Sequence, residues 1–402
     1  MSTASNQSHL IVVALRMAGI AGQDKLNGIF EFLSRGHRWQ LSIYRTAHEF
    51  TAKTVRHELD RGAEGFIVGI PGTDSALAEL ARHDVPTVAM NITGGDIERR
   101  RSALAFVRSD SAAIGHAAAQ ELLRQGVYRG FAYAGYRDDA DWSRERGIAF
   151  RTALRKAGFT SQILDRAHFH DRLDNREILI RWLCALPKPC GIFAACDDRA
   201  FELLDACHEA GIAIPDEIGI LGVNNDPILC ENAEPRLSSV QPDFIREGRL
   251  AAEILDRMLT NDRYRQMQAG TVHLVGLRQI VNRDSTPPRS DAGLLVQKAV
   301  SFIKRNALRG ISVQDVARHL NVSYSLINLR YQHLQGCSIH ETILQLRLAE
   351  VKRRLRTSTD SIDAIAAACG WSHPNSLKNL FKRRYGLTMR DWRSANRTQP
   401  RP

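Results

Sequence analysis

No stretch of this 402-residue chain approaches the ~18 consecutive apolar residues that a membrane-spanning helix needs. The first ten residues are polar and show no apolar segment behind a basic start, so we expect no secretory signal and a cytoplasmic location. The seven cysteines form no C-x-x-C pair, which favours reduced, buried thiols over disulfides or a zinc site.

Motifs for nucleotide binding and for covalent catalysis are also missing. No G-x-G-x-x-G follows the first apolar run, and there is no Walker loop. No Ser/His/Asp or Cys/His arrangement resembles a nucleophile elbow or a metal motif. His168 and His170 are better interpreted as part of a surface loop than as metal ligands. We therefore expect no cofactor, no metal and no enzymatic activity.

Acidic side chains are scarce in only one part of the chain. Residues 287–402 contain 20 Lys and Arg but 7 Asp and Glu, a net charge of +13. Residues 1–286 contain 35 Lys and Arg and 37 Asp and Glu, a net charge of −2. A basic excess confined to one folded segment indicates a polyanionic partner, most often nucleic acid, although a merely solvated basic surface is the alternative.

Before this basic segment, short apolar runs alternate with longer helical patterns. The first four runs span residues 9–15, 39–45, 65–70 and 86–91. This alternation predicts parallel strands covered by helices on both faces. Roughly ten such units are too many for one compact sheet. We therefore expect an α/β domain of two lobes with a cleft between them, spanning residues 1–286.

Polar residues follow several of these runs at the point where each strand is expected to end. Ligands of such sheets bind beyond the carboxyl ends of the strands. The candidates at these ends are Arg16, Asn91, Asp110, Asp197 and Asn224. Hydrogen-bonding groups with one cation and a few carboxylates suit a neutral sugar or polyol better than a phosphate.

The basic segment contains the same helical unit twice, in residues 312–336 and 361–386. In the first unit, Ser312 and Asp315 form a capping-box pattern that marks a helix start. Leu326, Ile327 and Leu334 are expected to face inward from its second helix. A helical hairpin without DNA-binding function can look similar. Two units in tandem on a basic segment, joined by a predicted helix over residues 339–358, favour an all-α domain with two helix-turn-helix units.

The outward faces of the two second helices supply the candidate DNA contacts. Base-reading side chains are predicted at Tyr324, Ser325, Asn328, Leu329, Asn375, Lys378 and Asn379. Phosphate contacts are predicted at Arg330, Lys382, Arg383 and Arg384.

Residues 9–286 resemble the effector domain of the LacI/GalR repressors and the periplasmic sugar-binding proteins, most clearly in "HEAGIAIPDEIGILGV" and "PRLSSV". The resemblance implies that Arg146, in "SRERGIAF", lies ahead of a helix and binds a sugar. It places Trp142 in the cleft, where its ring would stack on the sugar; a purely structural position in the core between the lobes is the alternative. Cys196-Asp197 replaces the family's Asn-Asp pair, and Asn224 replaces an aspartate.

Residues 292–393 resemble the DNA-binding domain of the AraC/XylS regulators, most closely in "GWSHPNSLKNLFKRRYGLTMRDWR". An effector domain followed by this DNA-binding domain (the reader) resembles the xylose-operon activators. The resemblance implies a homodimeric, sugar-responsive activator of a pentose catabolic operon that binds operator DNA and RNA polymerase. Pro287 and Pro288, with Ser, Asp and Gly around them, are typical of a linker and predict a domain boundary between residues 286 and 287. A non-sugar ligand, an enzyme on the two-lobed fold and a ligand-independent DNA-binding protein remain alternatives.

Overall fold

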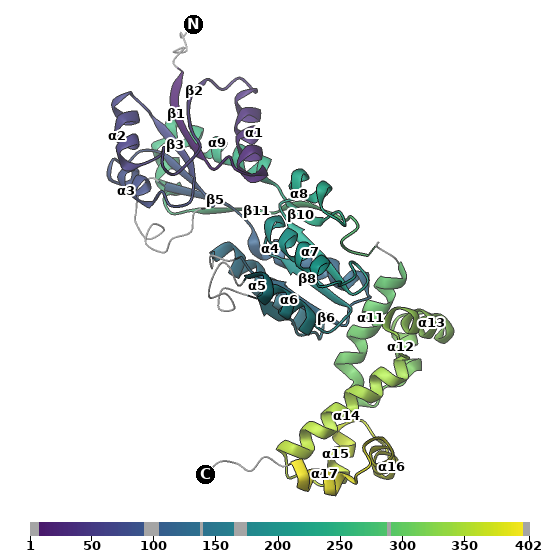
Figure 1. Cartoon of the computed structure of the whole chain (residues 1–402). Coiled ribbons are helices and arrows are strands. Elements are labelled where there is room, and N and C mark those ends of the chain that lie inside the picture. Colours follow the sequence, from purple (N-terminus) through teal and green to yellow (C-terminus); the bar gives the residue numbers. More distant parts are fainter. Residues whose placement is uncertain (1–7, 92–103, 137–139, 165–174, 288–290, 397–402) are drawn as a thin grey trace.

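The computed structural model of the chain describes residues 8–91, 104–136, 140–164, 175–287 and 291–396 (Figure 1). His168 and His170 lie outside these ranges. No helix within the described residues is long and apolar enough to cross a membrane.

The first lobe is a six-stranded parallel sheet in the order β11-β5-β4-β3-β1-β2. Its strands are β1 (His9–Leu15), β2 (Trp39–Tyr44), β3 (Gly65–Gly69), β4 (Thr87–Met90), β5 (Leu104–Ser109) and β11 (Val272–Val275). Alternate residues of β1 pack on opposite faces, as strand geometry requires. One face is covered by α1 (Ile20–Leu33) and α9 (Phe244–Thr260), and the other by α2 (Ala52–Asp60) and α3 (Asp74–Arg82). The short α10 (Asp262–Gln268) follows α9.

The second lobe repeats this plan in the order β12-β10-β9-β8-β6-β7. Its strands are β6 (Gly130–Ala134), β7 (Gln162–Leu164), β8 (Cys190–Ala194), β9 (Ile218–Val223), β10 (Ser238–Pro242) and β12 (Leu277–Val281). Its helices are α4 (Ser111–Gln125), α5 (Asp141–Lys156), α6 (Asn175–Ala185), α7 (Asp197–Glu209) and α8 (Pro227–Asn232). The exception to the parallel arrangement is β12, which runs antiparallel to β10 because a direct connection from β11 brings it in from the other lobe.

The basic segment is entirely helical in its described part. It comprises α11 (Asp291–Asn306), a 3₁₀ turn (Ala307–Arg309), α12 (Val313–His319), α13 (Tyr324–Gln335), α14 (Ile339–Thr357), α15 (Ile362–Ala368), α16 (Pro374–Tyr385) and α17 (Met389–Asn396). The helix-turn-helix units α12–α13 and α15–α16 lie at opposite ends of α14 (Figure 1).

The predicted helix start at Ser312 is confirmed, because Asp315 N donates to Ser312 Oγ over 3.3 Å and Ser312 N donates to the Asp315 carboxylate. Ile327 is fully buried as expected. The inward orientation predicted for Leu326 is wrong, since 37% of that residue is exposed. Adjacent helical positions differ by about 100° around the axis, so Leu326 and Ile327 cannot both face the core of so short a unit.

The first helix-turn-helix unit is packed directly on the second lobe. The apolar side of α11, formed by Val296, Ala299, Val300 and Ile303, belongs to one continuous core with residues of α4, β6, α12 and α13. Two hydrogen bonds reinforce the contact: Gln335 Nε2 donates to Gly126 O (2.7 Å), and Arg129 Nη2 donates to Gln335 O (2.5 Å).

The second unit has a separate core. Leu348, Val351 and Leu355 of α14 pack there against residues of α15, α16 and α17. The first helix-turn-helix unit is therefore packed on the second lobe, whereas the second unit is connected to the lobes through α14.

Gly126 provides a test of this docking. Its φ is +72°, and a Cβ atom there would lie 2.0 Å from Gly293 O at the start of α11. We expect Gly126→Ala to lower the free energy of unfolding by about 1–2 kcal/mol through backbone strain and by a further ~1–3 kcal/mol through overpacking. Urea denaturation of the wild type and of Gly126→Ala measures this loss of free energy of unfolding.

Gly211→Ala is the matched control, because Gly211 has a similar φ of +65° and open space around its Cβ position. This control should show the strain cost alone. Equal losses in the two variants would mean that Gly126 does not hold α11 against the lobe.

Candidate functional site

A cavity of about 320 Å³ lies between the lobes, at the carboxyl ends of strands from both sheets. Seven of the eight predicted ligand-binding residues line it: Arg16, Asn91, Trp142, Arg146, Cys196, Asp197 and Asn224. The eighth, Asp110, is not among the lining residues. Its carboxylate instead accepts a hydrogen bond from Ala113 N (2.8 Å) and caps the start of α4.

Arg146 and Trp142 form an apolar and cationic wall on the second lobe. The implied position of Arg146 ahead of a helix is wrong, because α5 begins at Asp141 and includes it. The Arg146 guanidinium carbon lies 4.7 Å from the centroid of the Trp142 ring, and Nη1 donates to Ala195 O over 2.5 Å. Burial lowers the pKa of Arg146. Its Nε is buried without a hydrogen-bond partner among the described residues, so a ligand could accept a hydrogen bond from this guanidinium.

Asp197, at the start of α7, shapes the same lobe. Its Oδ1 accepts from Ser239 Oγ (2.6 Å), and Oδ2 accepts from Asp226 N (2.8 Å). Burial raises the pKa of Asp197 to about 6 and that of the neighbouring Cys196 thiol to about 12. The carboxylate thus joins α7 to Ser239 in β10 and to the segment that follows β9, and burial disfavours the thiolate form of Cys196.

The opposite wall is a buried polar network on the first lobe. Glu247, which is fully buried, accepts from Asn91 Nδ2 (3.0 Å) and lies 3.5 Å from Lys25 Nζ. Asn91 Oδ1 in turn accepts from Ser109 N (3.0 Å), and Ser109 Oγ also donates to Glu247. Lys25 and Ser109 could not be singled out from the sequence, because neither immediately follows a predicted strand.

One ion pair spans the two lobes beside the cavity. Arg108 Nη1, at the end of β5, lies 2.8 Å from Glu145 Oε1 on α5. Arg108 also lines the cavity. Since the two residues come from different lobes, this pair is made only when the lobes are close together.

The predicted DNA-contacting residues lie on the two second helices with most of their side chains in solvent. In α13, Tyr324, Ser325 and Leu329 are exposed, and Asn328 and Arg330 are half-buried. In α16, all six are exposed: Asn375, Lys378, Asn379, Lys382, Arg383 and Arg384. Two already have partners, since Lys378 pairs with Asp363 (2.8 Å) and Arg384 with Glu341 (2.6 Å).

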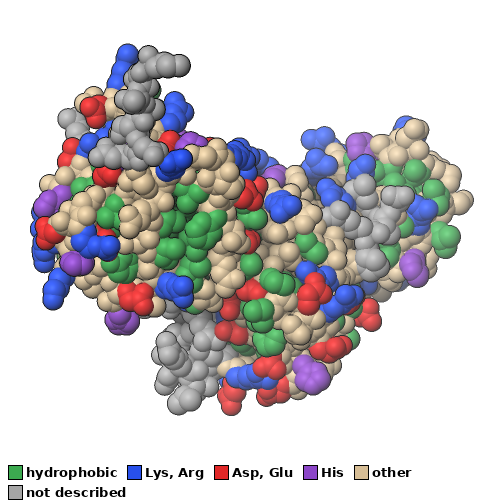
Figure 2. All heavy atoms as spheres, turned by 90° about the horizontal axis from the view of Figure 1, so that it is seen from above, with side chains coloured by type: hydrophobic (Ala, Val, Ile, Leu, Met, Phe, Trp, Pro, Cys, Tyr) green, Lys and Arg blue, Asp and Glu red, His purple; other side chains and the backbone are tan. Residues whose placement is uncertain are grey.

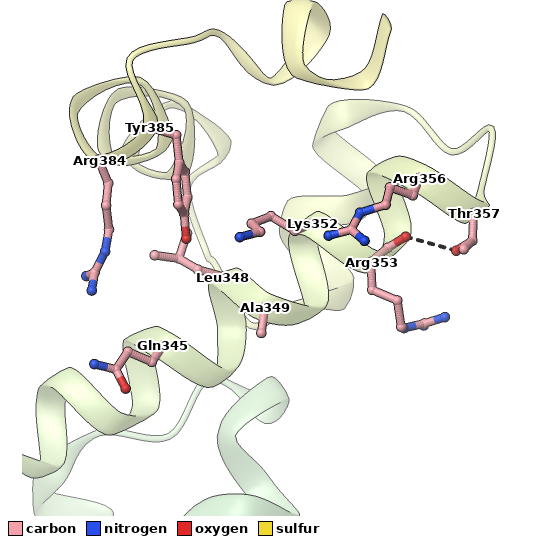
Figure 3. A pocket seen from close by; sticks show the side chains of 9 residues that line it. All are labelled: Gln345, Leu348, Ala349, Lys352, Arg353, Arg356, Thr357, Arg384 and Tyr385. Atoms are coloured by element: carbon pink, nitrogen blue, oxygen red, sulfur yellow. Dashed lines mark hydrogen bonds between the residues drawn. The ribbon is translucent and has the colours of Figure 1, made fainter. Parts of the chain in front are cut away.

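A groove of about 420 Å³ separates α14 from the end of α16 (Figure 3). Lys352 Nζ lies 4.9 Å from the centroid of the Tyr385 ring, and the Arg356 guanidinium 5.4 Å from that of Trp392. Arg353 pairs with Glu350 (2.6 Å). These cations lie on the joining helix α14, outside the second helices to which the predicted DNA contacts belong. On the face of the lobes seen in Figure 2, by contrast, acidic and basic side chains are interspersed.

Comparison with known families assigns both parts of the chain. Residues 119–286 match a periplasmic binding protein-like domain, and residues 316–395 match a helix-turn-helix domain. The chain therefore joins a periplasmic-binding-protein-like α/β region to a helical reader of the AraC type, as its sequence patterns predict.

Individual relatives share this combination over most of their length. The chain is 28% identical to the xylose operon regulatory protein of Haemophilus influenzae over 80% of this chain and 82% of that protein. It is 29% identical to the corresponding protein of Escherichia coli K12, over 80% and 81%. The solved structure of the xylose-binding transcription activator xylR aligns with a TM-score of 0.59 at 23% identity, over 98% of this chain and 100% of that one.

The interlobe ion pair can be tested by a double-mutant cycle. We expect Arg108→Gln and Glu145→Gln to show a coupling of about 0.2–1 kcal/mol in the free energy of unfolding, as for other partly exposed pairs. Each single variant should also increase the radius of gyration measured by X-ray scattering, because the lobes lose a contact. The matched pair Arg144–Asp141 lies within α5. Its loss should leave the radius unchanged, and a similar expansion there would contradict a role in lobe closure.

Proposed function

We propose that this chain is a sugar-responsive transcription regulator that activates a pentose catabolic operon. The observation that carries the proposal is the packing of a helix-turn-helix unit on the lobe that also forms one wall of the cavity. A protein so built can report occupancy of the cavity to DNA. The relatives named as regulators of xylose operons support a xylose-like ligand and a regulator rather than an enzyme.

The chemistry of the cavity supports a neutral sugar. Trp142 presents an aromatic face, which suits the C–H face of a sugar ring. Arg146, Asn224 and Asp198 line the same space and offer donors and acceptors for hydroxyl groups. The volume is at the lower end of small-molecule sites, which suits a monosaccharide.

The exposed faces of α13 and α16 are the proposed DNA contacts. Joined by α14, the two helices would enter successive major grooves of operator DNA, about one helical turn or ~34 Å apart. We further propose that the regulator acts as a cytoplasmic homodimer that contacts RNA polymerase, and that the boundary between sensor and reader lies between residues 286 and 287.

The direct experiment is a thermal-shift screen of the full chain against D-xylose, L-arabinose, D-ribose and D-glucose, followed by operator binding with each sugar. We expect a pentose to raise the unfolding midpoint and to change operator affinity. A chain that is stabilised by none of these sugars, or whose operator affinity no stabilising sugar alters, would contradict the proposal.

The role of Arg146 gives a quantitative prediction. Its loss in Arg146→Ala should cost about 1.5–3 kcal/mol of sugar affinity, because hydrogen bonds from a charged donor disappear. Operator affinity without sugar should hardly change. Calorimetry on the folded variant measures the loss, and Arg144→Ala, an exposed site on the same helix, is the control. Unaltered sugar affinity in Arg146→Ala would remove this residue from the site.

Contacts to DNA bases and contacts to DNA phosphates can be tested separately on α16. Asn375 is exposed in the first turn, whereas Lys382 is exposed in the last turn. Asn375→Ala should weaken operator binding by about 1–3 kcal/mol and leave random DNA almost unaffected. Lys382→Ala should weaken both DNAs and reduce the salt slope by about one unit.

The measurement is a salt titration of operator and random DNA for each variant and for the double variant. The two effects should be nearly additive, since the side chains would contact different parts of the duplex. Equal weakening of both DNAs by Asn375→Ala would show that this face does not read bases.

A further inference from the structure

A second cavity, of about 460 Å³, lies where the second lobe meets the first helix-turn-helix unit. It is bounded by α4 and α5 on the lobe side and by α11 and α12 on the other. Five basic or imidazole side chains line it: His116, Lys156, Lys298, Arg305 and His319. No Asp or Glu lines it within the described ranges of the chain.

The permanent charges in this cavity face no acidic side chain of the described residues. Lys156, Lys298 and Arg305 form no ion pair with any acid in the part of the chain that the structure describes. Converging like charges repel one another, and an anion placed among them would be attracted by all three. The three cations come from two helices that line the same cavity, Lys156 from α5 and Lys298 and Arg305 from α11.

A buried hydroxyl adds an independent observation. Ser301, on α11, is 6% exposed and lines the cavity, and its Oγ has no hydrogen-bond partner among the described residues. A buried hydroxyl without a partner is costly. An oxyanion in the cavity would accept a hydrogen bond from it.

Several lining groups are already held in place. The His319 ring stacks on Phe302 with ring centroids 4.1 Å apart. Arg305 Nε donates to Ser301 O over 3.1 Å, and His116 Nε2 lies 2.9 Å from Gln120 Nε2. Such prior ordering reduces the entropy that a ligand must overcome on binding.

We propose that this cavity binds a small phosphorylated metabolite, with the phosphate among Lys156, Lys298, Arg305 and Ser301. A phosphomonoester carries close to two negative charges and three acceptor oxygens at neutral pH, and it forms strong hydrogen bonds with cationic donors. The cavity is large enough for an attached sugar-sized group. The lysine, arginine and histidine side chains that line the cavity are exposed, so a DNA backbone phosphate is the competing source of this charge, and binding measured without DNA separates the two.

Such a ligand would act as a second effector. It would contact α5 of the lobe and α11 and α12 of the reader at the same time, so its binding would favour the docked arrangement of the two. If docking alters operator affinity, DNA and the phosphorylated ligand must affect each other's binding reciprocally.

The test measures binding of inorganic phosphate and of glucose 6-phosphate to the full chain by calorimetry, without DNA and at constant ionic strength, since salt screens charges. Glucose is the neutral control. We expect both anions to bind, and Lys156→Gln/Lys298→Gln to lose at least about tenfold in affinity. Ser301→Ala should lose about three- to tenfold without loss of thermal stability.

Lys53→Gln/Arg263→Gln changes the net charge equally at exposed positions of the first lobe and should bind both anions normally. Arg146→Ala should also retain phosphate binding, which separates this site from the sugar cavity. The proposal fails if neither anion binds the wild type, or if the Lys156→Gln/Lys298→Gln variant binds as tightly as the wild type. It also fails if that variant only weakens DNA binding, which would make these lysines contacts of the DNA backbone.

Discussion

The apolar side of α11 lies between two bodies that would otherwise be separate, the second lobe and the first helix-turn-helix unit. Val296, Ala299 and Val300 belong to the same core as Phe131 of β6 and Ile327 of α13. Protein interiors are densely packed and transmit displacement rather than absorbing it. The first helix-turn-helix unit is therefore expected to move together with the second lobe.

Much of this architecture could be predicted from sequence because its signals are local. Three features depend only on neighbours a few positions away in the chain. They are the strand at residues 9–15, the capping box at Ser312 and Asp315, and the polar residues at strand ends. Parallel topology then brings those strand ends to a shared edge. Seven of eight residues predicted for the cavity consequently line it.

What could not be predicted depends on tertiary partners. Asp110 follows a strand, as the other predicted cavity residues do. Its carboxylate, however, accepts a hydrogen bond from Ala113 N and caps α4 instead of lining the cavity. The apolar side of α11, formed by Val296, Ala299, Val300 and Ile303, would have the same sequence pattern whatever it packed on, so its contact with the lobe could not be predicted. The same holds for the ion pair between Arg108 and Glu145, which come from different lobes.

The attachment of the reader to only one lobe constrains how a sugar could act. Closure would move the first lobe relative to the second and strengthen contacts such as Arg108–Glu145, yet it would leave α13 fixed to the second lobe. Within one chain, the position of the first reading helix relative to its own lobe would then be the same with and without sugar. Ligand can shift an equilibrium only through a difference in affinity between two states. In the proposed homodimer, that difference would arise if the first lobe contacts the second copy, because closure would then change the spacing between the two readers.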